Sequence, residues 1–203
     1  MFTGHYAPAF ALNRRFPEVA LWKLFLGVQA VDILFWGLAV AGVERMHIDP
    51  TQKGPLVLVL EFMPFSHSLV AALGWAALCA LALRSREGLV LAVAVASHWL
   101  CDLPMHLGDL PIASGDGLRV GFDLWSHPVA AWAFECGLVI LSVLGAQKRL
   151  WKLAGILVAV QTLQSFLVPL PTSLPQVAAM SEASYLGFAL LAWRFTGAGS
   201  TSR

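Results

Sequence analysis

Apolar residues dominate six long stretches of the chain, and polar residues are concentrated in the short segments between them. A helix needs about 20 mostly apolar residues to cross the hydrocarbon core of a bilayer. The pattern therefore predicts an all-α fold, a single domain of residues 1–203 that forms a polytopic membrane helical bundle of about six transmembrane helices. The stretches cover residues 18–43, 55–83, 88–105, 121–146, 151–170 and 176–195.

Two prolines modify this prediction. The second stretch is too long for one straight helix, and Pro64 divides it into residues 54–63 and 65–83. Because proline removes a backbone donor and clashes with the preceding turn, we expect this second transmembrane helix to be broken at Pro64. The break would place His67 where the hydrocarbon is already interrupted. Pro104 should end the third helix in the same way.

Composition supports a membrane protein and disfavours other classes. Of the 203 residues, 58% are hydrophobic and 12% are charged, whereas soluble domains average roughly 45–50% and 25%. The net charge of +1 offers no basic surface for nucleic acid, so we expect no nucleic-acid partner. The expected partners are membrane lipid, including a possible lipid substrate, and possible subunits of a membrane complex.

The distribution of Lys and Arg sets the expected orientation. With six spans and the N-terminus inside, ten Lys/Arg fall on inner segments and three on outer ones, as the positive-inside rule requires. We therefore expect a multi-pass protein of the bacterial inner membrane with both termini cytoplasmic. The outer three are Arg45, Lys53 and Arg119, and the inner ten are Arg14, Arg15, Lys23, Arg84, Arg86, Lys148, Arg149, Lys152, Arg194 and Arg203.

Six ionisable side chains lie inside the apolar stretches, where charge is costly and polar groups are candidates for function. Counted from the inner helix ends at about 1.5 Å per residue, four of them fall roughly 18–21 Å deep, and the other two fall at about 15 and 25 Å. A common depth would let residues from different helices meet in one layer. The six are Asp32, His67, His98, Asp102, Glu135 and Glu182.

His98 and Asp102 are four residues apart and should share one face of a helix. Imidazole and carboxylate are ordinary zinc ligands, but such a pair can also be hydrogen-bonded without metal. Adding Asp32 and His67 favours a metal, because we predict no Lys or Arg in this layer and buried carboxylates otherwise need a proton. Glu135 can be a general base, a ligand or a neutral acid bonded to a neighbouring helix.

Three further residues leave alternatives open. Glu182 has the same alternatives as Glu135. His127 can be a ligand at the outer mouth or an interface residue. His5 precedes the first span, so it could reach the layer only if the N-terminal segment folded back between the helices.

The ordered motifs resemble a known family. Gly4-His5, Asp32, Ser66-His67-Ser68 and Ser97-His98-x-x-x-Asp102 look like the hallmarks of the bacterial membrane-bound metal-dependent hydrolases of the LexA-associated inner-membrane type. That family is distantly similar to zinc-dependent phospholipase C. The matches span residues 4–102, about half of the chain.

The resemblance implies a ligand set and an activity. It implies that the ligands are His5, Asp32, His67, His98 and Asp102, and that the cofactor is a divalent metal, expected to be zinc. A second His-x-x-x-Asp/Glu motif is missing, because His127 and Glu135 are eight residues apart. One or two metal ions are therefore expected instead of three.

We interpret the chain as a membrane-embedded metal-dependent hydrolase of a phosphoester or ester in a lipid-like substrate. In this interpretation Glu135 and Asp102 are the catalytic candidates. One alternative is a non-catalytic subunit of a larger membrane complex, with an imidazole on haem or a pigment, or with a purely structural role. A small transporter is another alternative, although the two halves show no repeat symmetry.

Overall fold

The computed structural model describes residues 2–49, 51–52, 57–113, 117–168 and 172–197. The chain is mostly helical, so the all-α prediction is confirmed at that level. The described α-helices are α1 (Tyr6–Arg15), α2 (Leu21–Val40), α3 (Leu69–Leu83), α4 (Arg86–Asp102), α5 (Pro128–Ser142), α6 (Lys148–Phe166) and α7 (Leu174–Thr196). Two short 3-10 helices, η1 (Thr3–His5) and η3 (Leu124–Ser126), precede α1 and α5.

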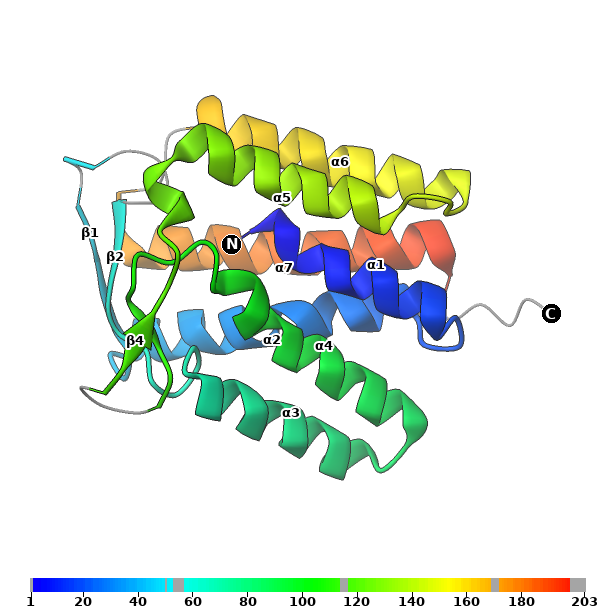
Figure 1. Ribbon diagram of the computed structural model, residues 1–203, viewed down its shortest axis with the longest axis horizontal. Helices are drawn as coiled ribbons and strands as arrows, with labels where there is room; N and C mark the ends of the chain where they lie inside the picture. Colours follow the sequence, from blue (N-terminus) through cyan, green and yellow to red (C-terminus); the bar gives the residue numbers. More distant parts are fainter. Residues whose placement is uncertain (1, 50, 53–56, 114–116, 169–171, 198–203) are drawn as a thin grey trace.

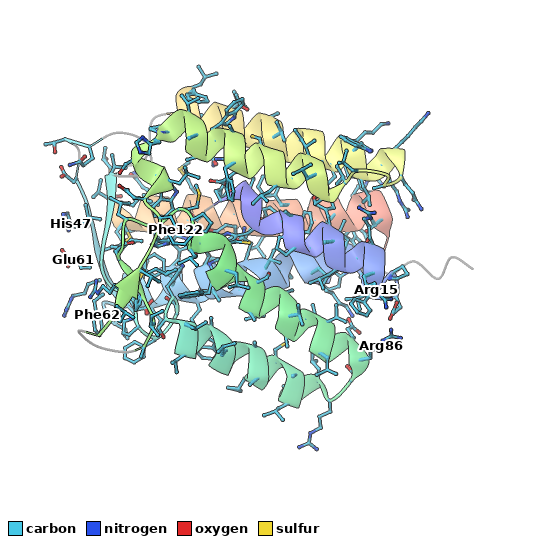
Figure 2. All side chains as sticks on the ribbon, in the orientation of Figure 1. Arg15, His47, Glu61, Phe62, Arg86 and Phe122 are labelled. Carbon is cyan, nitrogen blue, oxygen red and sulfur yellow. The ribbon has the colours of Figure 1, made fainter. Side chains whose placement is uncertain are left out.

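The helices run along the long axis of the molecule, and the strands lie at one end (Figure 1). Helix α2 packs against α4 and α7, α3 packs against α4, and α5 packs against α6. The strands form two antiparallel hairpins, in which β1 (Arg45–Ile48) pairs with β2 (Leu58–Phe62) and β3 (Leu110–Pro111) pairs with β4 (Arg119–Val120). We call the strand end the hairpin end and the opposite end the basic end, where Arg15 and Arg86 are seen in Figure 2.

Among the described helices, only α2 is long and apolar enough to cross a membrane by length and composition. This finding differs from the six spans predicted above. Helices α3, α4 and α5 have 15, 17 and 15 residues, which is short of the 18 that the criterion requires. Helices α6 and α7 are long enough but not sufficiently apolar. The predicted stretches were longer because they included turns and strands beside the helices.

The prediction that residues 54–63 form half of a broken helix is wrong where the structure describes them. Residues 58–62 are strand β2, paired antiparallel with β1. A short apolar run such as Leu58-Val-Leu cannot be distinguished from a buried helix by periodicity alone, because both are continuously apolar. The chain then turns at residues 64–68, where the Ser68 side chain caps α3 by accepting a hydrogen bond from the Ala71 N–H.

Helix α1 is an element that the hydrophobic pattern did not predict. It begins near the middle of the bundle and runs to the basic end (Figure 1), packing against α2, α5 and α4. Tyr6, Ala9 and Phe10 are fully buried, and the rings of Tyr6 and Phe10 both contact Phe25 of α2. The N-terminal segment therefore folds back between the helices, which is the condition for His5 to reach the polar layer.

Helix α3 is apolar on nearly all of its surface. Of its 15 residues, only Ala72 and Ala76 are buried, while Leu78 and Leu81 are 56% and 69% exposed. These small buried residues allow α3 to lie close to α4. A helix in water normally shows a polar face to the solvent, and α3 has none.

We expect Phe10→Ala to lower the free energy of unfolding by about 3 kcal/mol, because it leaves a cavity between α1 and α2. Phe122→Ala is the matched control, since Phe122 is 72% exposed, and it should change stability by less than about 0.5 kcal/mol. Denaturant unfolding in detergent followed by tryptophan fluorescence measures both. Equal losses for the two variants would contradict this placement of α1.

Candidate metal centre

Five imidazole and carboxylate side chains from four separate segments converge near the middle of the bundle. His5 ends η1, Asp32 lies on α2, and His67 lies in the turn before α3. His98 and Asp102 lie one turn apart on the inner face of α4. All five are buried, and Asp32 is the most accessible, with 13% of its side chain exposed.

The distances describe one connected cluster around Asp102. Its Oδ1 lies 3.1 Å from His5 Nε2, and its Oδ2 lies 3.1 Å from His98 Nε2 and 3.7 Å from His67 Nε2. Asp32 Oδ1 lies 3.1 Å from His67 Nε2 and 3.4 Å from His98 Nε2. Both carboxylates therefore face more than one imidazole nitrogen.

These separations fit the coordination of a metal. Two groups of three residues each place one ligand atom per residue within 4.8 Å of the others: His5–His98–Asp102 and Asp32–His67–His98. Zinc bonds of about 2.0–2.1 Å in a tetrahedron separate neighbouring ligand atoms by about 3.3 Å. The measured distances of 3.1 to 3.7 Å lie on both sides of this value. The buried His/Asp groups could thus hold a metal ion.

The hydrogen bond that His98 makes through Nδ1 determines which of its ring nitrogens faces the cluster. His98 Nδ1 lies 2.7 Å from the carbonyl oxygen of Val28, which can only accept, so Nδ1 carries a proton. Helix α2 comes close enough for this bond because residue 27 is glycine, and a Cβ there would lie 3.2 Å from the Cβ of Ala94. In a neutral His98 the lone pair is then on Nε2, the atom that faces Asp32 and Asp102.

His67 is oriented by a chain of buried hydrogen bonds. Ser66 Oγ donates to the Glu44 carboxylate and lies 2.8 Å from His67 Nδ1, which donates to it. Glu44 is only 1% exposed, and it also accepts hydrogen bonds from the backbone N–H groups of Phe65 and Ser66. This carboxylate–serine–histidine arrangement resembles the outer-shell partners that orient metal-binding histidines.

Two imidazoles share one carboxylate at the centre of the cluster. His5 Nε2 and His98 Nε2 are buried, and each lies 3.1 Å from an oxygen of Asp102. The two rings are stacked, with centroids 3.9 Å apart. The three groups lie close enough together to bind one ion.

No Lys or Arg of the described residues pairs with these carboxylates. The Lys–Glu and Arg–Glu ion pairs of the described residues lie elsewhere, between Lys23 and Glu87 and between Arg86 and Glu18. All four of these residues belong to the basic end. The imidazoles lie close enough to carry part of the counter-charge for Asp32 and Asp102, and a bound cation at the same place would do so as well.

Asp32 receives a further hydrogen bond from α7. The Tyr185 hydroxyl donates to Asp32 Oδ2 at 3.0 Å, and the Trp36 indole N–H donates to the same hydroxyl at 3.3 Å. Oδ1 is left facing the imidazoles. The tyrosine thus fixes which carboxylate oxygen points into the cluster, and nothing in the sequence spacing linked residue 185 to residue 32.

His106 is a cluster residue to which the sequence analysis assigned no role. Its Nε2 lies 3.9 Å from Asp102 Oδ2, and its Nδ1 lies 2.8 Å from Asp109 Oδ1. A Cβ at Gly121 would clash with the His106 carbonyl, so glycine is required where the two loops meet. The spacing His98-x-x-x-Asp102-x-x-x-His106 was the available signal.

The Asp109 carboxyl behaves as the anionic partner of His106. Partial burial alone would raise the pKa of Asp109, but the hydrogen bond from His106 and the charge of that imidazole hold it below its ordinary value. An ionised Asp109 keeps the proton of His106 on Nδ1. In the neutral form of His106 the lone pair is then on Nε2, the atom that faces Asp102.

Glu135 and Gln161 hold the N-terminal segment in place. Glu135 Oε2 accepts hydrogen bonds from the Phe2 and Gly4 N–H groups at 2.9 and 3.0 Å. Gln161 Oε1 accepts from the Thr3 N–H and hydroxyl. These contacts connect Glu135 to the segment that carries His5. Neither three-residue ligand group includes Glu135, and its role as a general base stays a prediction.

Three other polar residues named from the sequence lie outside the cluster. Glu182 is half-buried on α7, one turn before Tyr185. His127 is exposed at the start of α5, and His47 pairs with Glu61 on the β1–β2 hairpin. None of the three belongs to either ligand group among the described residues.

Comparison of the chain with protein-family models, with curated proteins and with solved structures finds no match. The function must therefore be argued from the cluster and its surroundings.

We expect the purified protein to hold about one or two divalent ions per chain, and His98→Ala or Asp102→Ala to abolish stoichiometric binding. His98 contributes to both ligand groups, so its loss affects every candidate position. Elemental analysis after extraction in mild detergent measures the metal content. His47→Ala and His127→Ala are matched controls that should retain it. Unchanged metal content in the His98 and Asp102 variants would refute the site.

Ser66→Ala should weaken metal affinity by about 10- to 100-fold, because it releases His67 Nδ1 and leaves the Glu44 carboxylate without its hydroxyl partner. The matched control is Ser97→Ala. Ser97 lies beside His98 in sequence but bonds only to the Ala94 carbonyl among the contacts described. Competition with a chromogenic chelator gives both affinities. If both variants bind as the parent does, the Glu44–Ser66 chain does not orient a ligand.

Proposed function

We propose that the protein is a membrane-embedded, metal-dependent hydrolase of the bacterial inner membrane that acts on a phosphoester or ester of a lipid-like substrate. The observation that carries this proposal is the convergence of imidazole Nε2 atoms on the Asp32 and Asp102 carboxylates, at separations of 3.1 to 3.7 Å. The proposed ion is zinc, because the donor set of histidine and aspartate and its spacing suit zinc.

The outer surface of the bundle supports a membrane location. Large apolar side chains are exposed along every long helix of the periphery, including Leu81 (69%), Leu89 (61%), Leu141 (61%) and Leu190 (62%). Such a surface is costly in water and natural in lipid. Short helices can be accommodated where the bilayer thins locally. The basic end would face the cytoplasm, in agreement with the positive-inside rule.

The proposed chemistry assigns different tasks to the cluster residues. A bound zinc ion would lower the pKa of a water molecule and polarise the oxygen of the substrate. Asp102 presents its two oxygens to different imidazoles and so suits a bridging position. Asp32 is the most exposed member, so the substrate would approach from its side. Glu135 is proposed as a positioning residue that keeps His5 in the cluster through Phe2 and Gly4.

The position of the cluster supports a lipid-like substrate. The site is buried among apolar helices, and a soluble phosphoester would have to leave water to reach it. A molecule with acyl chains instead partitions into the bilayer around the helices. The motif order also resembles that of membrane-bound metal-dependent hydrolases, which favours the same reaction. The haem or pigment alternative is disfavoured, because the stacked His5 and His98 rings leave no space for a porphyrin between them.

The expected result is hydrolysis of a phospholipid or lipid ester in mixed micelles, abolished by a chelator and restored by zinc. Asp32→Asn should lower kcat by at least about 100-fold, because the amide removes the anionic ligand and leaves an amide donor near Tyr185. Mass spectrometry of lipid products measures the activity. Asp49→Asn is the matched control, since Asp49 bonds to Thr51 in an exposed loop.

Two results would count against the proposal separately. A chain that binds zinc but hydrolyses no lipid ester or phosphoester would retain the metal centre and lose the hydrolase function. Recovery of the native protein in the soluble fraction, without detergent, would refute the membrane location. A Soret band in the absorption spectrum would favour the pigment-binding alternative instead.

A further inference from the structure

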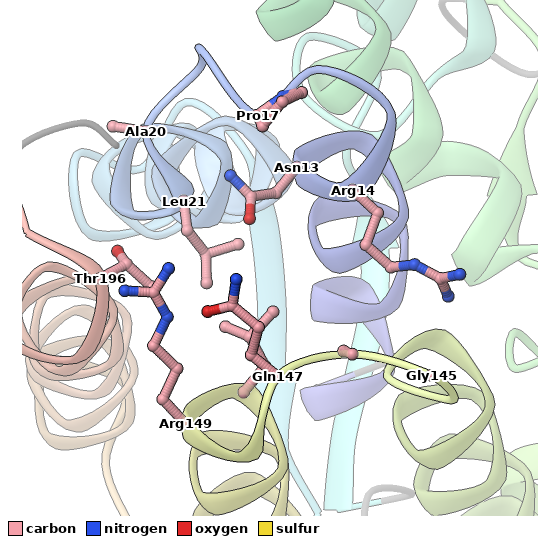
Figure 3. A pocket seen from close by; sticks show the side chains of 11 residues that line it. Asn13, Arg14, Pro17, Ala20, Leu21, Gly145, Gln147, Arg149 and Thr196 are labelled. Atoms are coloured by element: carbon pink, nitrogen blue, oxygen red, sulfur yellow. The ribbon is translucent and has the colours of Figure 1, made fainter. Parts of the chain in front are cut away.

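A second polar site lies at the basic end, far along the bundle from the hairpin end. A cavity of about 280 Å³ is enclosed there by the end of α1, the start of α2, the α5–α6 turn and the end of α7. This volume is close to the lower limit of roughly 300–1,000 Å³ for small-ligand pockets. Four polar side chains from three helices and a turn reach it: Asn13, Gln147, Arg149 and Thr196 (Figure 3).

Arg149 is the central residue of this cavity. Its side chain extends from α6 toward Thr196 of α7, and the Gln147 amide lies beside it (Figure 3). The Nε atom of Arg149 is buried and has no hydrogen-bond partner among the described residues. The Arg149 side chain as a whole is half-buried, so its other donors reach the cavity. A buried N–H without an acceptor is costly, so an acceptor from outside the described chain is expected.

The start of α6 adds donors on the same side. Gln147 is the N-cap residue, but its side chain makes no capping hydrogen bond, and the first turn contains no acidic residue. The first N–H groups of a helix have no acceptor within the helix and carry partial positive charge. Arg14 also lines the cavity, while no Asp or Glu is among the described lining residues. The surroundings are therefore suited to an anion.

We propose that this cavity, built around Arg149 and the start of α6, binds a phosphate group. Arg forms forked hydrogen bonds to phosphate oxygens, and helix N-termini bind such oxyanions. The phosphate can belong to a free phosphate compound of the cytoplasm or to the headgroup of an anionic lipid. Both sources are present at this level if the basic end lies at the membrane surface. The site is separate from the metal centre and does not depend on hydrolysis.

The test uses the full chain in neutral detergent with two probes. Inorganic phosphate, compared with chloride at equal ionic strength, is titrated by calorimetry, and phosphatidylglycerol in mixed micelles is compared with phosphatidylcholine by thermal unfolding. Arg149→Gln should weaken phosphate binding by about tenfold or more, which corresponds to the loss of one charged hydrogen bond. Lys148→Gln is the matched control: it removes an exposed charge next to Arg149 that does not line the cavity.

A second variant separates binding from folding. Gln147→Glu places a carboxylate at an exposed position of the cavity; it should stabilise the start of α6 and still weaken phosphate binding by about tenfold or more. Binding of inorganic phosphate alone supports a soluble ligand, and selective stabilisation by phosphatidylglycerol supports a lipid headgroup. The proposal is overturned if neither probe binds, or if Lys148→Gln weakens binding as much as Arg149→Gln.

Discussion

The structure depends on how the buried charge of Asp32 and Asp102 is neutralised. Each carboxylate faces two or more imidazole nitrogens, and the partners of Nδ1 direct the Nε2 lone pairs of His67, His98 and His106 to the same place. Buried carboxylates are stable only beside positive charge or hydrogen-bond donors. The surrounding polar residues hold the imidazoles and Asp32 in the positions that supply them.

The side chains that orient the cluster residues come from many parts of the fold. The Glu44 side chain in the turn before β1 orients His67 through Ser66, and α7 contributes Tyr185 to Asp32. Helices α5 and α6 contribute Glu135 and Gln161, which hold the segment that carries His5. The latter half of the chain thus contains no ligand from the recognised motifs but secures two of the ligands in place.

Some of this arrangement could be read from the sequence and some could not. The bounds of α2, α4 and α7 follow from apolar length and proline positions, and the pair His98–Asp102 follows from its four-residue spacing. Strand β2 was misread because its pairing with β1 is a contact between distant residues, which composition does not record. Helix α1 has few long apolar runs and is buried by contacts with α2. Glu44 and Tyr185 join the centre only through tertiary packing.

The N-terminal segment has a consequence for how the protein matures. His5 is held by Glu135 and Gln161, and the hydrogen bond from Gly4 to Glu135 joins residues 131 positions apart. During synthesis these acceptors emerge long after η1 and α1. All five cluster residues have by then been made, but the segment that carries His5 still lacks the side chains that hold it. His5 is therefore the last of the five to be fixed in position, although it is the first to be synthesised.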